Sequence, residues 1–381
     1  MTKTCDGLLF GGMNGGSYAE YNLLAEGVAM QQRREQALAG CLLGGAIGDA
    51  LGLAYEGLSP RRLARLSPGP LRFRVFPGLA LVSDDTEHAA LTAQALLRSR
   101  GDTDRFERVL AWRLRLWIAA LPAGVGWATG RALWKLWLGI PPGRNGVRSA
   151  GNGPAMRAAI LGVYLARQPH SLAEHVARST RLTHTDIRAE AGAHCIALAA
   201  AQASQGSSDP LQLAHLLAPV LEQDGEGMAD FRMLMRAMFE SVAKGERTQA
   251  FCAAQGWQRG VLGYVVHTVA AALHAWLSHP QDLDAALEDI IRSGGDVDST
   301  AALVGGLVGA GVGVQGLPPA RCAALRDWPW NQQRLSRLAI ALARGGREGS
   351  LYPCWPLALL RNLLFLLLVL GHGLRRLLPP Y

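Results

Sequence analysis

Leucine and alanine recur at helical spacing through most of this chain. Between residue 40 and about residue 316, apolar residues fall three and four positions apart, as in segments 190–201 and 265–277, and glycine or proline interrupts the pattern. Runs in which β-branched and polar residues alternate are nearly absent. The pattern therefore predicts an all-α protein, a compact orthogonal bundle of many helices.

Two groups of glycines recur at every fourth position, which places each group on one face of a helix. They are Gly44, Gly48 and Gly52 in one predicted helix and Gly305, Gly309 and Gly313 in another. We expect these helices to pack closely, because a residue without a side chain lets two backbones approach each other.

The pattern divides the chain into three parts. Residues 1–36 carry a glycine-rich stretch and little periodicity, so they are predicted to be a flexible N-terminal tail. Residues 37–345 carry the helical pattern and are predicted to form one folded domain. In residues 346–381 proline, tryptophan and then leucine dominate, which predicts an apolar C-terminal appendage.

The appendage contains an almost wholly apolar run at residues 363–374, bracketed by arginines. This run is too short to cross a bilayer, and extending it back to Trp355 includes Arg361 and Asn362. Two interpretations stay open. Residues 355–381 either make peripheral contact with a membrane surface or pack on the folded domain.

Composition narrows the function classes. A chain of 381 residues with 49% hydrophobic and 18% charged residues can bury a large core. Its net charge of +8 suits an anionic partner, but the arginines are spread along the chain, so charge alone does not indicate nucleic acid. The six cysteines form no CxxC pair, which argues against a zinc knuckle or a disulfide framework. No secretion signal is evident, so a cytoplasmic location is expected.

Two pairs of carboxylates stand at predicted helix starts. Asp296 and Asp298 follow two glycines, and Asp84 and Asp85 lie between two hydroxyl residues in the segment SDDT at 83–86. Asp298 is predicted to be the N-cap of its helix, which leaves Asp296 unexplained. Either pair alone is equally well interpreted as a solvated cap. Two such pairs favour a bound cation, and oxygen ligands suit Mg²⁺ or Mn²⁺.

Two further acids flank a glycine-spaced segment. Asp49 lies among apolar residues and is predicted to be a buried hydrogen-bond anchor. Glu56 lies where the helical pattern ends, before Gly57 and Pro60. It is interpreted either as a proton-transferring residue in a cleft or as an ordinary surface glutamate.

A glycine-flanked loop, residues 151–153, opens another predicted helix. Its backbone N–H groups could hold a phosphate, although a Rossmann motif is not completed because Met156 occupies the last glycine position. His184 lies between two threonines before a further helix. An isolated histidine is more often structural than a ligand, so both interpretations stay open for it.

Taken in order, these segments resemble the ADP-ribosylglycohydrolase family, which includes dinitrogenase reductase-activating glycohydrolase and the ADP-ribosyl-acceptor hydrolases. The resemblance spans most of residues 40–316. It rests on five blocks, at residues 44–56, 83–86, 151–157, 183–184 and 294–300. It implies a catalytic domain over residues 37–345 with a two-metal cleft, which removes ADP-ribose from a modified protein side chain or a small acceptor by hydrolysing an N- or O-glycosidic bond.

The resemblance also implies roles for individual residues. Two Mg²⁺ or Mn²⁺ ions would be held by Ser83, Asp84, Asp85, Asp296, Asp298 and Ser299. Asn152, Gly153 and His184 would contact the ADP-ribose, and Glu56 or Asp85 would transfer protons. Many relatives have threonine where Ser83 and Ser299 stand, but serine keeps the hydroxyl. The acceptor is not fixed by the sequence.

Two other functions remain as alternatives. A non-catalytic relative that only binds ADP-ribose would have lost metal ligands, and the expected ligands are all present here. An immunity or antitoxin protein would oppose an ADP-ribosyltransferase toxin, either by hydrolysis or by inserting an extra segment into the toxin's cleft. Residues 1–36 keep that alternative open.

Overall fold

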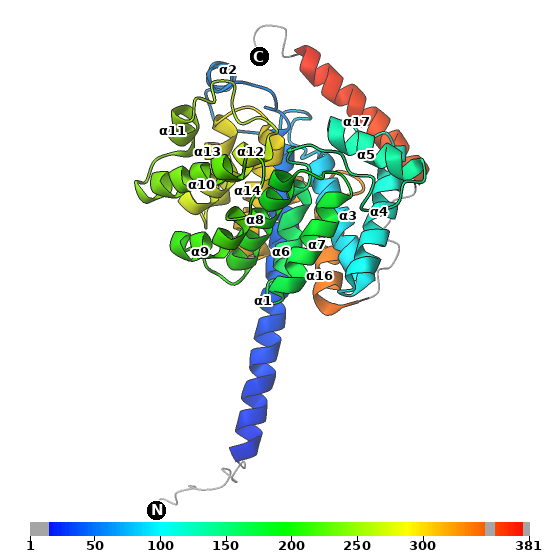
Figure 1. The fold of residues 1–381 in the computed structure, drawn as a ribbon, viewed down its shortest axis with the longest axis vertical. Helices are drawn as coiled ribbons and strands as arrows, with labels where there is room; N and C mark the ends of the chain where they lie inside the picture. The colour runs from blue at the N-terminus through cyan, green and yellow to red at the C-terminus, as the bar shows by residue number, and fades with distance from the viewer. Residues whose placement is uncertain (1–14, 347–354, 376–381) are drawn as a thin grey trace, which may run out of the picture.

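The computed structural model describes residues 15–346 and 355–375, and it is all-helical as the sequence predicts (Figure 1). Within these residues the chain forms isolated β-bridges but no strand. The first helices are α1 (Gly15–Gly52), α2 (Pro60–Leu66), α3 (Asp84–Ser99), α4 (Thr103–Ala119), α5 (Trp127–Trp137), η1 (Ala155–Arg157), α6 (Ala158–Tyr164), α7 (Pro169–Arg181) and α8 (Ile187–Ser204). They are followed by α9 (Pro210–Leu221), α10 (Met228–Ala243), α11 (Thr248–Ala254), α12 (Val265–Ser278), α13 (Leu283–Arg292), α14 (Val297–Val312), η2 (Val314–Gly316), α15 (Pro319–Ala324), α16 (Gln332–Arg344) and α17 (Trp355–Arg375).

The centre of the fold is the antiparallel crossing of α1 and α14, where glycines bring the two backbones into contact. A Cβ atom added at Gly44 would lie 2.2 Å from the carbonyl oxygen of Gly305, and one at Gly40 would lie 2.0 Å from that of Gly309. The expected close packing is confirmed. Because the helices run in opposite directions, the end of α1 at Gly52 meets the start of α14, and this places two acidic segments side by side.

Helix starts elsewhere show what an ordinary acidic cap does in this protein. The side chains at the N-cap positions of six helices accept a backbone N–H of the first turn; these are Ser59, Asp102, Asp186, Asp209, Asp282 and Asn331. At the starts of α3 and α14 the N-cap residues are Ser83 and Asp296, and neither side chain makes a capping hydrogen bond. These two polar side chains are therefore available for other contacts.

The N-terminal segment differs from the prediction. Residues 15–36 are helical and continue directly into the buried part of α1, so a flexible tail over 1–36 is wrong for them, and residues 1–14 lie outside the described residues. No proline or cap interrupts the segment, and extending an existing helix costs little. The first half of α1 projects from the body (Figure 1), and Glu35 pairs with Arg344 of α16 at 2.8 Å where the helix meets it.

The C-terminal helix α17 packs along the body instead of standing apart from it. Its Phe365 is buried in a small apolar cluster with Leu53 and Leu81. The helix has 21 residues, and its most apolar 18-residue window has a mean hydropathy of 1.9, so by length and composition alone it could cross a membrane. The apolar run at residues 363–374, too short by itself to cross a bilayer, thus belongs to a longer helix. Only 11% of its most apolar window is buried in the structure.

Candidate functional site

A cleft of about 520 Å³ opens where the start of α3, the start of α14 and the turn after α1 meet. The loop before η1, the start of α5 and the inner face of α17 complete its walls. Of the site residues predicted from the sequence, those that line the cleft are Glu56, Ser83, Asp84, Asn152, Gly153, His184, Asp296, Asp298 and Ser299. Asp85 lies just behind this wall and accepts a hydrogen bond from the Ser299 hydroxyl at 3.1 Å.

Asp49 orients the first acidic segment. It is fully buried, and its carboxylate accepts the backbone N–H of Ser83 at 2.9 Å and that of Thr86 at 3.1 Å. The hydroxyls of both residues donate to it as well. Asp49 thus caps α3 from a neighbouring helix, which confirms it as a buried hydrogen-bond anchor. With the flanking residues held in this way, Asp84 faces the cleft.

The second acidic segment corrects one sequence prediction. Asp296, not Asp298, occupies the N-cap position of α14, and its side chain accepts a hydrogen bond from Asn152 Nδ2 at 2.7 Å instead of capping. Asp298 lies in the first turn. The reason is local: Gly295 has a φ of 93° and packs so tightly that a Cβ would lie 2.1 Å from the Val261 carbonyl oxygen, and this turn sets where the helix begins.

Glu56 lies at the exposed rim of the cleft, in the turn that follows α1. The backbone N–H of Gly57 donates to the carbonyl oxygen of Gly295 at 2.7 Å, and this bond ties the turn to the segment that carries Asp296 and Asp298. Glu56 is therefore exposed to solvent and also lines the cleft. Its position is compatible with a proton-transferring residue and with an ordinary surface glutamate.

The carboxylates in this wall repel one another in a buried environment. Burial raises the pKa of Asp84 and of Asp85 well above its usual range, and the neighbouring carboxylates raise both pKa values further. Burial, followed by the charge of Glu56, does the same to the pKa of Asp298. The Oδ1 atoms of Asp85 and Asp298 are buried without a hydrogen-bond partner. Such unsatisfied anionic oxygens fit a bound cation.

The donor set is suited to a hard cation, because the side chains in this wall offer carboxylate and hydroxyl oxygens. Across the described part of the chain, no three His, Cys, Asp or Glu side chains converge as a preformed metal site. The two-metal cleft expected from the sequence therefore stays a prediction. The acids are gathered, but a cation would have to draw them together.

The loop over residues 151–153 differs from a phosphate cradle. The N–H of Gly151 donates to the Ser149 hydroxyl at 3.2 Å, and the N–H of Asn152 donates to the Gly263 carbonyl oxygen at 3.0 Å. These two groups are thus committed within the protein, against the expectation that they would hold phosphate. Because Asn152 donates to Asp296, its side chain serves to position that carboxylate.

Buried Arg157 organises the far wall, and sequence reasoning did not assign it a role. Its guanidinium donates to the Ser179 hydroxyl at 2.9 Å and to Thr183 Oγ1 at 2.7 Å, and it contacts His88 Nδ1 at 3.2 Å. Thr183 Oγ1 in turn contacts His184 Nδ1 at 2.9 Å. A fully buried arginine needs this many acceptors, so the arrangement fixes His184 beside the loop.

His184 is neutral in this setting. Burial and the nearby Arg157 lower its pKa to about 3. Since Arg157 donates to Thr183 Oγ1, the Thr183 hydroxyl proton is left for His184 Nδ1 at 2.9 Å or for the Thr180 carbonyl oxygen at 3.4 Å. The shorter contact favours His184, whose proton then lies on Nε2. That N–H donor adjoins Gly151, where an added Cβ would lie 3.1 Å from it.

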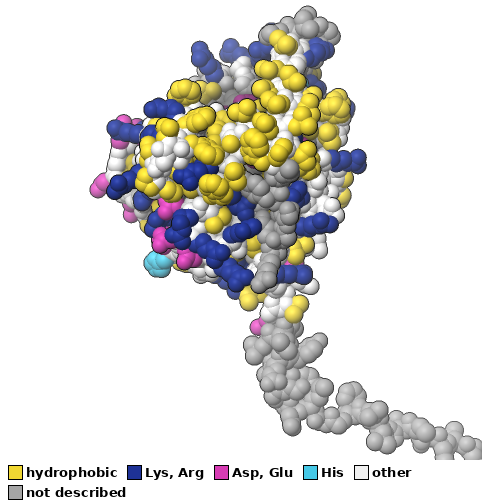
Figure 2. Space-filling model, turned by 90° about the vertical axis from the view of Figure 1, so that its right-hand side faces the viewer, with side chains coloured by type: hydrophobic (Ala, Val, Ile, Leu, Met, Phe, Trp, Pro, Cys, Tyr) yellow, Lys and Arg dark blue, Asp and Glu magenta, His cyan; other side chains and the backbone are white. Residues whose placement is uncertain are grey.

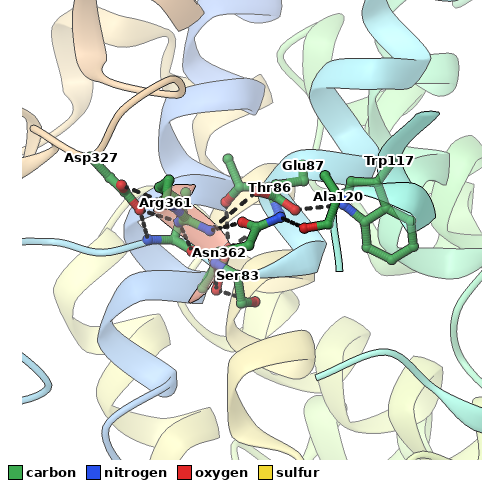
Figure 3. A network of polar contacts seen from close by, with 10 residues as sticks. Ser83, Thr86, Glu87, Trp117, Ala120, Asp327, Arg361 and Asn362 are labelled. Atoms are coloured by element: carbon green, nitrogen blue, oxygen red, sulfur yellow. Dashed lines mark hydrogen bonds and ion pairs between the residues drawn. The ribbon is translucent and has the colours of Figure 1, made fainter. Parts of the chain in front are cut away.

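Part of the remaining wall is apolar, and this part was not predicted. Trp127 at the start of α5 and Phe365 and Val369 on α17 line this part of the cleft. A signal was present in the sequence: Arg361 inside an apolar helix requires a buried acidic partner, so the helix had to pack on the body. Figure 3 shows the result, with Arg361 between Asp327 and Glu87.

The fold and site define an all-α protein with an acid-lined cleft between helix starts. The model of the ADP-ribosylglycohydrolase family matches residues 30–350, so the chain belongs to that family, whose members hydrolyse ADP-ribose linkages. The resemblance noted in the sequence is thereby confirmed.

Individual relatives cover most of the chain. The ADP-ribosyl-[dinitrogen reductase] glycohydrolase of Rhodospirillum rubrum is 26% identical over 286 residues, which are 73% of this chain and 86% of that protein. The uncharacterised protein YegU of Escherichia coli is 29% identical over 330 residues, 82% of this chain and 97% of that one. A solved ADP-ribosylglycohydrolase-related protein complex superposes with a TM-score of 0.62 at 28% identity, covering 83% of this chain and all of that chain.

Proposed function

We propose that this protein is a metal-dependent hydrolase that releases ADP-ribose from a modified protein side chain or a small ADP-ribosyl acceptor. The observation that carries the proposal is the convergence on one cleft of acids from the turn after α1, the start of α3 and the start of α14. Isolated acidic caps would be scattered over the surface and individually satisfied. Here they face a common space, and two of their buried oxygens lack partners.

Mg²⁺ or Mn²⁺ fits this wall best, in keeping with its oxygen ligands. The residues proposed to hold the two ions are Ser83, Asp84, Asp85, Asp296, Asp298 and Ser299. When bound, such ions supply positive charge for orienting vicinal hydroxyls and lower the pKa of water. The unpartnered Oδ1 atoms of Asp85 and Asp298 are the atoms of this chain that gain most from a cation.

The other residues of the cleft divide the remaining tasks. The Nε2–H of neutral His184 is a donor suited to a ribose or phosphate oxygen, and Asn152 keeps Asp296 in place. Glu56 at the rim is placed to exchange protons with solvent and with a leaving group, since a carboxylate in such a position can act as acid or base. Phe365 and Trp127 give the cleft an apolar surface.

Hydrolysis is tested by incubating the purified full-length chain with ADP-ribosyl-arginine, ADP-ribosyl-serine, ADP-ribosylated nucleic acid and O-acetyl-ADP-ribose. We expect release of ADP-ribose from at least one of them with Mg²⁺ or Mn²⁺, and loss of release after chelation. Release that is undiminished by exhaustive chelation would refute the metal requirement.

A second measurement is independent of activity. Mg²⁺ at about 100 times its Kd is expected to raise the free energy of unfolding by about 2.7 kcal/mol, because only the folded chain gathers the acids. Thermal unfolding with and without the ion measures this. A melting temperature that no divalent cation changes would contradict the proposed site.

The alternative of an antagonist that binds an ADP-ribosyltransferase takes a more definite form in the structure. The first half of α1 projects from the body (Figure 1), at the end of the helix opposite to the cleft. A chain beginning at Glu26 keeps the contacts of α1 with α16 and removes residues 15–25 of the projecting part. Hydrolysis that persists in this variant while binding to a transferase is lost would support the antagonist role, and unchanged binding would exclude the projecting segment from it.

A further inference from the structure

Helix α17 has two different faces. The residues that face the body recur at helical spacing: Arg361 and Asn362, then Phe365, Val369 and His372. Arg361 donates to the Val82 carbonyl oxygen at 2.7 Å, Asn362 to that of Ala120 at 2.9 Å, and His372 contacts that of Ala54 at 3.1 Å. These polar contacts hold the helix flat against the body along its length.

The opposite face of α17 is a continuous leucine stripe exposed to solvent. Its members follow the helical repeat and are Leu360, Leu363, Leu364, Leu367, Leu370 and Leu374. Leu360 is 54% exposed, and Leu367 and Leu374 are each 65% exposed. The leucines therefore do not pack on the folded domain; the arginine and asparagine do. An apolar stripe of this length is costly in water and is typical of a surface that binds something.

A second group of exposed apolar side chains adjoins the stripe. Trp127 is 81% exposed, Trp134 61% and Leu138 80%, all in or just after α5. The loop between α4 and α5 touches α17 directly, because Ala123 packs against the cluster that contains Phe365. In Figure 2 the apolar side chains gather over one face of the molecule, with arginines and lysines around them.

Leu121 in the same loop is held in an unusual backbone conformation. Its φ is 52°, in the left-handed region that residues other than glycine rarely adopt, and its side chain is 58% exposed. Strain of this kind commonly marks a functional site. Here it holds a leucine out toward solvent beside α17.

The C-terminal end of α17 borders a basic cavity of about 630 Å³. Arg72, Arg74, Arg321 and Arg375 line it together with His372. Arg321 shares its charge with Asp284 at 3.1 Å, but no acidic side chain of the described residues lines the cavity itself. A cavity with this lining suits a phosphate-bearing group.

We propose that the leucine stripe of α17, the α5 tryptophans and the basic cavity together dock the protein onto an anionic lipid bilayer. Leucines that enter the acyl region, tryptophans at the interface and arginines at the headgroups are the pattern of a helix lying in a membrane surface. A protein partner would not require leucines, tryptophans and arginines to be arranged together in this way. Because Arg361 and Asn362 are bound to the body, α17 lies along the bilayer and does not cross it.

Docking in this way brings the cleft to the membrane. Phe365 and Val369 line the cleft from the inner face of the same helix, and Trp127 belongs to both surfaces. This part of the inference rests on the proposed function: the favoured substrate class is an ADP-ribosylated protein that is itself at the membrane surface. The docking surface stands by itself, and vesicle binding tests it without any substrate.

The test is co-sedimentation of the full-length chain with vesicles of phosphatidylcholine alone or with about 30% phosphatidylserine, at low and at high salt. We expect binding to the anionic vesicles that weakens as salt rises. The double variant L360E/L367E should bind them at least about tenfold more weakly, since each glutamate would have to enter the apolar layer. R72E/R74E should lose the salt-dependent part of the binding.

A matched control separates docking from general surface effects. Leu211 on α9 is 75% exposed on a helix that α17 does not touch, and L211E should bind vesicles as the unmodified chain does. Equal loss in L211E, or no co-sedimentation at low salt, would overturn the proposal. The proposal would also be overturned if the chain bound no vesicles and formed a dimer that L360E/L367E dissociates, since the stripe would then join two copies of the chain.

The test also separates docking from the proposed function. Release of ADP-ribose from a soluble substrate should be unchanged in L360E/L367E. If the unmodified chain binds vesicles but hydrolyses none of the ADP-ribosylated substrates, the proposed function fails and docking stands.

Discussion

The two walls of the cleft are built by opposite means. The acidic wall is formed by helix starts that meet because α1 and α14 cross with their backbones in contact. Asp49 fixes this wall by accepting the backbone N–H of Ser83. The apolar wall belongs to α17, which reaches the body through a few polar contacts and leaves its leucines in solvent. One wall is part of the central core, and the other is laid against it.

This difference suggests that the reaction and the choice of substrate depend on different walls of the cleft. A close crossing of helices tolerates little change, so groups that must be held accurately are best placed there. A helix fixed by side chains can change its exposed and cleft-facing residues with little effect on the core. The acidic wall therefore suits the chemistry, and the apolar wall suits recognition of the acceptor.

The largest effect is expected at Asp296. Asp296→Asn keeps the size of the side chain but removes one anionic ligand, so release of ADP-ribose should fall by about 10³-fold or more, and the Mg²⁺-dependent rise in melting temperature should shrink. Asp230→Asn alters an exposed acid in the first turn of α10 and should have neither effect. Full activity in Asp296→Asn would show that the Asp296 carboxylate is not needed for hydrolysis.

Glu56 is expected to come next. Glu56→Gln cannot exchange a proton, so kcat should fall by about 10²- to 10⁴-fold while ADP-ribose affinity, measured by calorimetry, changes little. Glu222→Gln, at an exposed helix end, is the control. A kcat equal to that of the unmodified enzyme would return Glu56 to the role of a surface residue.

The crossing that supports the acidic wall can be broken directly. Gly44→Leu would force a side chain into the Gly305 carbonyl oxygen and should cost about 3 kcal/mol or more in unfolding free energy. In the same helix a Cβ at Gly27 meets nothing within 4 Å, so Gly27→Ala should stabilise the chain by about 0.5–1 kcal/mol. Denaturant unfolding measures both. Similar stabilities would show that the close approach is not required.

The smallest effect is expected at the apolar wall. Phe365→Leu should change the ratio of kcat/KM between two acceptors by about tenfold or less and leave catalysis of the better one largely intact. Leu364, the preceding residue, is 55% exposed, and Leu364→Ala should leave the ratio for soluble acceptors unchanged. An equal loss for every acceptor in Phe365→Leu would mean that this wall supports the chemistry as well.

The sequence predicted the features that depend on periodicity and local pattern. The spacing of leucine and alanine predicted the helices, four-residue glycine spacing predicted the crossing, and Asp49 among apolar residues predicted a buried anchor. The projecting half of α1 was missed because a helix without a packed face has no apolar period. Asp296 at the N-cap was missed because the preceding glycines adopt positive φ, which composition does not show.

The apolar wall shows a different limit of prediction. A pattern shows which residues seek burial but not which distant segment will cover them. Arg361 and Asn362 were interpreted as interruptions of an apolar run, whereas they are the residues that attach the run to the body. A charge within an apolar helix is better treated as a contact whose partner lies elsewhere in the chain.

The antiparallel crossing of α1 and α14 also has a consequence for the order of events during synthesis. Asp85 and Ser299, which touch in the finished cleft, are 214 residues apart in the chain. Contacts between residues so far apart in the chain form late, because the entropy cost of closing a large loop comes before the contacts contribute any stabilisation. The first acidic segment leaves the ribosome long before the second, so a growing chain carries an incomplete acidic wall until α14 docks onto α1. The same delay leaves the glycine face of α1 without its partner helix until α14 has been synthesised.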